Sequence, residues 1–141
     1  MNLRPILLVE DNTDDAFFMQ RAFEASGVSN RVSIAADGEA AIELLQAAAD
    51  GDELERPCVV LLDLKLPYKT GFDVLQWIRG HNPLRTTAVV VLTSSNEPSD
   101  ISRALDLGAN AYVVKPSAYA DLTRVVAAIR DFWLRCHRAG P

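Results

Sequence analysis

Residues 57–62 read PCVVLL, a continuous apolar run in which no polar side chain alternates. Similar runs occur at 5–9 (PILLV), 88–92 (AVVVL) and 111–114 (AYVV). Continuous runs of this kind are typical of strands that are covered on both faces, as in parallel sheets. The segment 31–35 (RVSIA) alternates in part, and it predicts a weaker, fifth strand at an edge of the sheet.

Helical patterns occupy the segments between these runs. In the first of them, Phe17, Phe18 and Ala22 recur at helical spacing and predict the buried face, with Thr13 or Asp14 as the cap. Strands that alternate with helices predict right-handed crossovers onto a parallel sheet, which is a doubly wound α/β fold with helices on both faces. The predicted helices span residues 14–26, 37–49, 71–79, 98–108 and 119–135.

Length and composition describe one soluble domain. The chain has 141 residues, a hydrophobic fraction of 49% and a formal net charge of −5. These values predict a single domain over 1–141, with a short C-terminal helical extension and no output domain. The acidic balance argues against nucleic-acid binding, and no apolar run reaches the ~20 residues that cross a membrane. Two cysteines and two histidines disfavour disulfides and a zinc site, so we expect a cytoplasmic protein.

Polar residues follow each strong apolar run, at the point where the predicted strand ends. Glu10 and Asp11 follow the first run, Asp63 the second, Thr93 the third and Lys115 the last. Because the carboxyl ends of parallel strands meet at one edge of a sheet, we expect these side chains to lie together. Each residue alone is explained well enough as a polar strand terminus. Three acids in one cleft, however, are costly without a cation or a bound proton.

The residue types at this edge suit a metal ion and a phosphoryl group. Oxygen ligands without thiols or imidazoles favour a hard ion, and a few carboxylates with water favour Mg²⁺. A carboxylate can also accept a phosphoryl group and form an aspartyl phosphate. A divalent cation and a lysine would neutralise the oxygens of that group, and a hydroxyl would bond one of them.

Four motifs, in this order, resemble the receiver domain of two-component response regulators. They are Val9-Glu10-Asp11-Asn12, Leu62-Asp63-Leu64-Lys65-Leu66-Pro67, Leu92-Thr93-Ser94 and Val114-Lys115-Pro116. The resemblance extends over nearly the whole chain. It implies a flavodoxin-like (βα)5 fold, with a five-stranded parallel sheet in the order 2-1-3-4-5.

The resemblance implies a role for each acidic residue at the strand ends. Asp63 corresponds to the phosphoacceptor. Asp11 and Asp63 would bind Mg²⁺ directly and Glu10 would bind it through water. The backbone carbonyl of Lys65 would be the remaining protein ligand.

The same resemblance implies a switch beside the acids. Thr93 corresponds to the switch hydroxyl, Tyr112 to the switch aromatic and Lys115 to the phosphate-binding lysine. The Lys115–Pro116 peptide bond is cis in this family, which proline permits at modest cost. The chain departs from the family where Thr70 takes the place of the usual Asp or Asn, although Thr70 can still cap the following helix.

The C-terminal third narrows the resemblance. Residues 106–116 (DLGANAYVVKP) and 131–134 (DFWL) resemble the small response regulators that partner bacterial and cyanobacterial phytochromes, and the enlarged loop at 51–56 fits that group. This implies a sensor histidine kinase as partner, with a bacteriophytochrome as the candidate. A downstream phosphotransfer or target protein would receive the signal.

Three consecutive large apolar residues occur near the C-terminus. A helix cannot bury Phe132, Trp133 and Leu134 together in its own core, so they predict a homodimer contact. The alternative is that Trp133 covers the edge of the core while Phe132 is half exposed. Asp14 and Asp15 are interpreted as first-turn residues favoured by the helix dipole, with no ligand role.

Together these features predict a stand-alone response regulator that is not an enzyme beyond its own phosphoryl transfer and dephosphorylation. It would signal by protein contact or by passing the phosphoryl group on. Two other classes of protein share part of this chemistry. A Mg²⁺-dependent phosphatase with an Asp nucleophile would place a second Asp at the position of Lys65. A flavodoxin-like cofactor-binding module would need a hydroxyl- and Gly-rich loop where residues 10–15 read EDNTDD.

Overall fold

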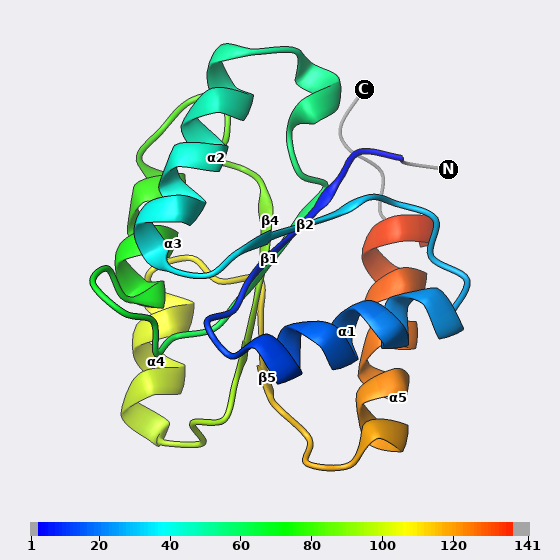
Figure 1. Ribbon diagram of the computed structural model, residues 1–141. Helices are drawn as coiled ribbons and strands as arrows, with labels where there is room; N and C mark the ends of the chain where they lie inside the picture. Colours follow the sequence, from blue (N-terminus) through cyan, green and yellow to red (C-terminus); the bar gives the residue numbers. More distant parts are fainter. Residues whose placement is uncertain (1–2, 137–141) are drawn as a thin grey trace.

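The computed structural model describes residues 3–136 as a parallel sheet between two layers of helices (Figure 1). The five strands lie in the order β2-β1-β3-β4-β5, as the resemblance implied. The strands are β1 (Ile6–Val9), β2 (Val32–Ala35), β3 (Val59–Leu62), β4 (Ala88–Thr93) and β5 (Ala111–Val114). The helices are α1 (Thr13–Ala25), α2 (Gly38–Asp50), α3 (Gly71–Arg79), α4 (Pro98–Asp106) and α5 (Tyr119–Ile129). A short helix η1 (Glu53–Glu55) follows α2, and η2 (Arg130–Cys136) follows α5.

Side chains of the central strands alternate between the two faces of the sheet. In β3, Val59 and Leu61 pack in a cluster with α1 and α5, whereas Val60 and Leu62 pack in a second cluster with α2 and α3. Figure 1 shows α1 and α5 on one side of the sheet and α2, α3 and α4 on the other. Every residue of β1, β3 and β4 is buried, which confirms the prediction from their continuous apolar runs.

The two outer strands are less covered than the central ones. β2 pairs with β1 alone, as its partial alternation predicted. The prediction was wrong for β5, which was expected to be covered on both faces. Ala111, Tyr112 and Val113 are half-buried, and Val114 is 43% exposed. The physical reason is its place in the sheet, because an outer strand has one neighbour and incomplete helix cover.

α1 buries only part of the predicted face: the prediction is confirmed for Ala22 and wrong for Phe17 and Phe18. Its buried residues are Ala16, Met19, Ala22 and Phe23, while Phe17 and Phe18 are exposed and pack edge-to-face on each other. The buried face combines the small Ala16 and Ala22 with the larger Met19 and Phe23, which fill the space against the sheet. The cap also differs, because Asn12 accepts the hydrogen bond from the Asp15 amide.

The C-terminal segment changes its helical geometry after α5. α5 ends at Ile129, and η2 continues as a π-helix over the last described residues. The enlarged loop at 51–56 contains the 3-10 turn η1, which Asp52 caps. None of the helices within residues 3–136 is long and apolar enough to cross a membrane.

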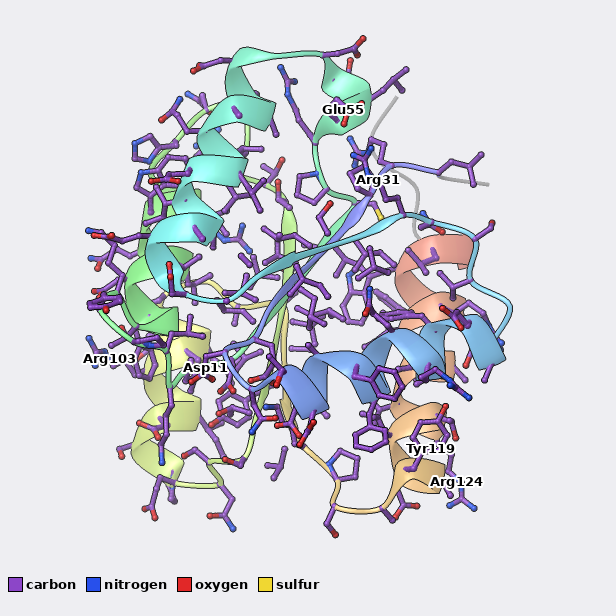
Figure 2. The ribbon with its side chains drawn as sticks, in the orientation of Figure 1. Asp11, Arg31, Glu55, Arg103, Tyr119 and Arg124 are labelled. Carbon is purple, nitrogen blue, oxygen red and sulfur yellow. The ribbon has the colours of Figure 1, made fainter. Side chains whose placement is uncertain are left out.

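α4 has a narrow contact with the rest of the fold. Across this helix, which is described in full, Ala104 is the one buried side chain. Ala104 packs with Leu64, Phe72 and Val91 in a small third cluster. Arg103, labelled in Figure 2, lies over the Phe72 ring with its guanidinium carbon 4.1 Å from the centroid. α4 therefore buries one small apolar side chain and makes one cation–π contact with α3.

Candidate phosphoacceptor and metal site

The carboxyl ends of the strands bring three acids together. Oxygen atoms of Glu10, Asp11 and Asp63 lie within 4.8 Å of one another. Glu10 and Asp63 are buried, at 3% and 7% exposure, whereas Asp11 is exposed to solvent. In Figure 2, Asp11 lies at the lower end of the sheet, away from the ion pair of Arg31 and Glu55 at the upper end. The sequence prediction that these acids converge on one edge is confirmed.

Lys115 joins the acids into one ionic cluster. Its Nζ donates to Asp63 Oδ2 at 3.0 Å and also to Glu10 Oε1. It donates as well to Asp15 Oδ2 at 3.1 Å. Asp15 lies in the first turn of α1 and outside the group of possible metal ligands, as predicted, but its contact with Lys115 was not predicted. α1 starts directly after the acidic pair, so its first turn projects Asp15 back over the end of β5.

Burial and charge shift the protonation of this cluster. Burial raises the pKa of Glu10 to about 7, although hydrogen bonds from Lys115 and the Asn12 amide act in the opposite direction. Burial also lowers the pKa of Lys115, but its hydrogen bonds to Glu10 and Asp63 outweigh that effect and raise the pKa overall. Lys115 therefore stays protonated, and one cation is shared among carboxylates crowded in a buried site.

A hydroxyl on β4 contacts the same aspartate. Thr93 is fully buried, and its Oγ1 donates to Asp63 Oδ1 at 2.8 Å. The Lys115 amide donates to the Thr93 carbonyl at 2.7 Å, so the ends of β4 and β5 are held together. Asp63 therefore has a neutral donor on one oxygen and a cationic donor on the other.

Tyr112 connects this edge to α4. Its hydroxyl donates to the Ser95 carbonyl at 2.8 Å, and burial raises the pKa of Tyr112, so the phenol remains a donor. The Ser95 hydroxyl donates to Asp100 Oδ2 at 2.6 Å in the first turn of α4. A continuous set of hydrogen bonds thus runs from β5 through the β4–α4 turn to α4. The sequence identified Tyr112 but missed Ser95 and Asp100, which are polar residues without a distinctive motif.

The loop between β3 and α3 (residues 63–70, the β3–α3 loop) closes the site on another side. The Lys65 amide donates to Asp63 Oδ1 at 3.3 Å. Thr70 and Asp73 form a capping box at the start of α3, which confirms the predicted cap. The Lys65 carbonyl as a metal ligand stays a prediction.

The predicted cis bond between Lys115 and Pro116 is wrong for this structure. Within residues 3–136, the one cis peptide bond is Asn82–Pro83. The trans form is the intrinsically favoured isomer of an X–Pro bond, and Lys115 reaches Glu10 and Asp63 with it.

The donor set fits a hard divalent cation. In the described part of the chain, Glu10, Asp11 and Asp63 form the one group of side chains that could hold a metal ion, and all their ligand atoms are oxygens. Carboxylate oxygens are the ligands that Mg²⁺ and Mn²⁺ take in proteins. The exposure of Asp11 leaves the group open to solvent. The residues present therefore fit the ion that the sequence predicted.

The predicted interface residues separate into three environments. Phe132 is 58% exposed, and Trp133 is half-buried against the α1–α5 cluster. Leu134 is 3% exposed and belongs to that core. The prediction of Leu134 as an interface residue is thus wrong, because the geometry of η2 turns its side chain toward the core. Phe132 remains as the exposed member.

Comparison with known proteins places this geometry in a family. Residues 6–127 match the model of the response regulator receiver domain. The probable methanogenesis regulatory protein FilR2 of Methanothrix harundinacea is 42% identical over 96% of this chain and 88% of that protein. Response regulator Rcp1 of Synechocystis is 37% identical over 92% of this chain and 88% of its own length.

Solved structures of similar proteins share the whole fold. The Mn²⁺-bound form of Rcp1 has a TM-score of 0.84 and 35% identity, covering 98% of this chain and 99% of that one. The phosphorylated cyanobacterial phytochrome response regulator RcpA has a TM-score of 0.85 and 36% identity, with 96% of both chains covered. The bacteriophytochrome response regulator AtBRR has a TM-score of 0.75 and 40% identity, with 100% of both covered. This chain belongs to the receiver-domain response regulators of two-component signalling.

Proposed function

We propose that this response regulator accepts a phosphoryl group on Asp63 from a sensor histidine kinase, in a step that depends on Mg²⁺. The observation that carries the proposal is the pair of donors on Asp63, with Thr93 on one oxygen and Lys115 on the other. Donors of these two kinds stabilise the charge that spreads over phosphoryl oxygens during transfer. In the transfer, the P–N bond of a phosphohistidine breaks, a P–O bond to an Asp63 carboxylate oxygen forms, and the histidine nitrogen keeps the electron pair.

The acidic group would hold the cation for this step. Asp11 and Asp63 would bind Mg²⁺ directly, Glu10 through water and Lys65 through its carbonyl. When bound, Mg²⁺ would act as a Lewis acid toward the phosphoryl oxygens. The Mn²⁺-bound form of Rcp1 supports a divalent cation in a protein of this family.

The hydrogen bonds beyond the site supply a route for the output. Replacing the Thr93–Asp63 bond by a bond from Thr93 to a phosphoryl oxygen would shift the end of β4. Tyr112 bonds Ser95 in the turn that follows β4, and Ser95 bonds Asp100 in α4, so the position of α4 would change with it. The altered surface of α4, β5 and α5 would then contact a target, or the phosphoryl group would pass to a second protein.

A bacteriophytochrome is the kinase that we propose as the partner. The proposal rests on the overall similarity to RcpA and AtBRR, which are described as phytochrome and bacteriophytochrome response regulators. It is tested by mixing this chain with the autophosphorylated kinase and following loss of label from the kinase. Transfer within seconds to this chain, but not to Asp63→Asn, is the expected result.

The two other function classes fit the residues less well. An Asp-based phosphatase would need an acid two positions after Asp63, where Lys65 has an exposed side chain. A flavodoxin-like module would bring a phosphate to the loop after β1, where Glu10 and Asp11 would repel it.

We also propose a homodimer that uses Phe132. Its ring packs edge-to-face on Trp133, 4.5 Å between centroids, and is 58% exposed. Light scattering should give the mass of two chains, and Phe132→Ser should shift it to one, while Phe17→Ser at a comparably exposed phenylalanine should not. A monomer at high micromolar concentration contradicts the dimer.

The phosphoacceptor is tested by intact mass after incubation with acetyl phosphate. We expect one phosphoryl adduct that requires Mg²⁺ and is absent in Asp63→Asn. Asp106→Asn, at an exposed position that ends α4, is the matched control and should be labelled normally. An adduct that survives Asp63→Asn would refute the assignment.

A further inference from the structure

The β3–α3 loop rests on the first residue of α2. Gly38 begins α2 and is buried. A Cβ at Gly38 would lie 2.3 Å from the carbonyl oxygen of Lys69 and 2.7 Å from its Cβ. Figure 1 shows the start of α2 beside the loop that leads from β3 into α3. A residue with any side chain would collide with the loop, so glycine permits this approach.

The start of α3 rests on the first residues of the loop, directly after β3. A Cβ at Gly71 would lie 2.2 Å from the carbonyl oxygen of Asp63, and the Gly71 amide donates to the Leu64 carbonyl at 2.9 Å. Within the loop, the Leu66 side chain is 8% exposed and packs in the same cluster as the buried residues of α2. The loop is thus fixed between the start of α2 and the backbone of Asp63.

We propose that Gly38 is a positioning residue for the acidic site, which it reaches through the β3–α3 loop. The inference rests on the proposed function, because the loop carries Lys65, the expected carbonyl ligand. Lys65 also donates its amide to Asp63 Oδ1 at 3.3 Å. Gly38 touches none of the acids, so its effect is indirect.

The size of the expected displacement follows from the contact distance. Ordinary contacts of a Cβ begin at 3.4 Å, so a Cβ now 2.3 Å from the Lys69 oxygen must push it by about 1 Å. Metal ligands tolerate deviations of only about 0.2 Å. Alanine is also a better helix former than glycine, so an effect confined to α2 would stabilise the fold. Weaker metal binding by a folded variant would therefore be due to displacement of the β3–α3 loop.

The test compares Gly38→Ala with Gly80→Ala by calorimetric titration with Mg²⁺. A Cβ at Gly80 lies 3.5 Å from the Gln76 carbonyl, which is an ordinary contact. We expect Gly38→Ala to weaken Mg²⁺ binding at least about 10-fold, as outer-shell changes do. The Mg²⁺ concentration for half-maximal labelling by acetyl phosphate should rise by the same factor, while Gly80→Ala matches the unmodified chain. A folded Gly38→Ala that binds Mg²⁺ normally overturns the proposal.

A second measurement covers the case in which Gly38→Ala does not fold. In amide NMR spectra of the unmodified chain, Mg²⁺ should shift the Gly38 resonance and leave Gly51, at the opposite end of α2, in place. An unmoved Gly38 resonance overturns the proposal. If the unmodified chain neither binds Mg²⁺ nor becomes labelled, the proposed function itself fails. If the unmodified chain and Gly38→Ala both bind Mg²⁺ normally, only the role of Gly38 fails.

Discussion

Replacing Thr93 by Val removes one hydrogen bond and keeps the shape of the side chain. The Thr93 hydroxyl is fully buried and donates to Asp63 Oδ1 at 2.8 Å. A hydrogen bond to a charged group contributes about 1.5–3 kcal/mol. Asp63 keeps Lys115 on its other oxygen and the Lys65 amide at 3.3 Å, so part of the loss is compensated. We expect the free energy of unfolding to fall by about 2 kcal/mol.

Urea denaturation and thermal unfolding measure this change. A loss of that size in a domain of 141 residues lowers the melting temperature by roughly 5–10 °C. Labelling by acetyl phosphate should persist, because Asp63 and Lys115 remain in place. The matched control is Thr123→Val on α5, whose exposed hydroxyl bonds the Ala120 carbonyl, and it should change stability by less than about 0.5 kcal/mol.

Two results would contradict this reasoning. A loss for Thr93→Val as small as that of Thr123→Val would mean that the Thr93–Asp63 bond contributes nothing to the folded state. A loss above about 4 kcal/mol would mean that Asp63 is left as an uncompensated buried charge. In that case the pairing of Asp63 with Lys115 described above would be wrong.

Two further predictions concern the opposite end of the sheet. The Arg79 guanidinium donates to the carbonyls of Gly108, Arg85 and Thr87. Arg79→Met should therefore lower the free energy of unfolding, measured in urea, by about 2–4 kcal/mol, and Arg79→Lys should be destabilised as well, because an ammonium group cannot donate to all three carbonyls at once. Full stability of Arg79→Lys would mean that these three hydrogen bonds are not what stabilises the fold. Burial raises the pKa of the Cys58 thiol, so this thiol should resist a disulfide reagent at pH 8 in the folded chain and react on unfolding. Rapid labelling of the folded chain at Cys58 would contradict the protection of this thiol. Because the folded thiol holds its proton to higher pH than the unfolded one, the free energy of unfolding should also decline as pH rises above 9.0.

The residues of the site could be predicted from the sequence because the fold converts position along a strand into position in space. A strand buried on both faces is continuously apolar, so its carboxyl end is marked by the first polar residue. Asp63 and Thr93 are predicted in this way, Lys115 follows the apolar run of the half-covered β5, and parallel pairing of the strands brings all three to one edge. The resemblance to receivers then added the roles.

What could not be predicted depends on how helices rotate and cover the sheet. Asp15 reaches Lys115 across 100 residues of sequence, and that contact is set by the rotation of α1. The same rotation decides that Phe17 and Phe18 are exposed. The half-buried state of β5 likewise depends on how its neighbouring helices cover it, and the sequence of β5 alone does not indicate that.

The narrow attachment of α4 has a consequence for local opening. Burial of the Ala104 methyl contributes about 1 kcal/mol, and the contact of Arg103 with Phe72 adds about 0.5–2 kcal/mol. The hydrogen bond from the Ser95 hydroxyl to Asp100 adds about 1.5–3 kcal/mol. An equilibrium constant changes tenfold for every 1.4 kcal/mol, so the gain or loss of one such contact should shift the position of this helix. Its amide hydrogens should therefore exchange with solvent well before those of β3, where every side chain is buried. A chain whose centre is rigid thus has one helix whose release requires little free energy.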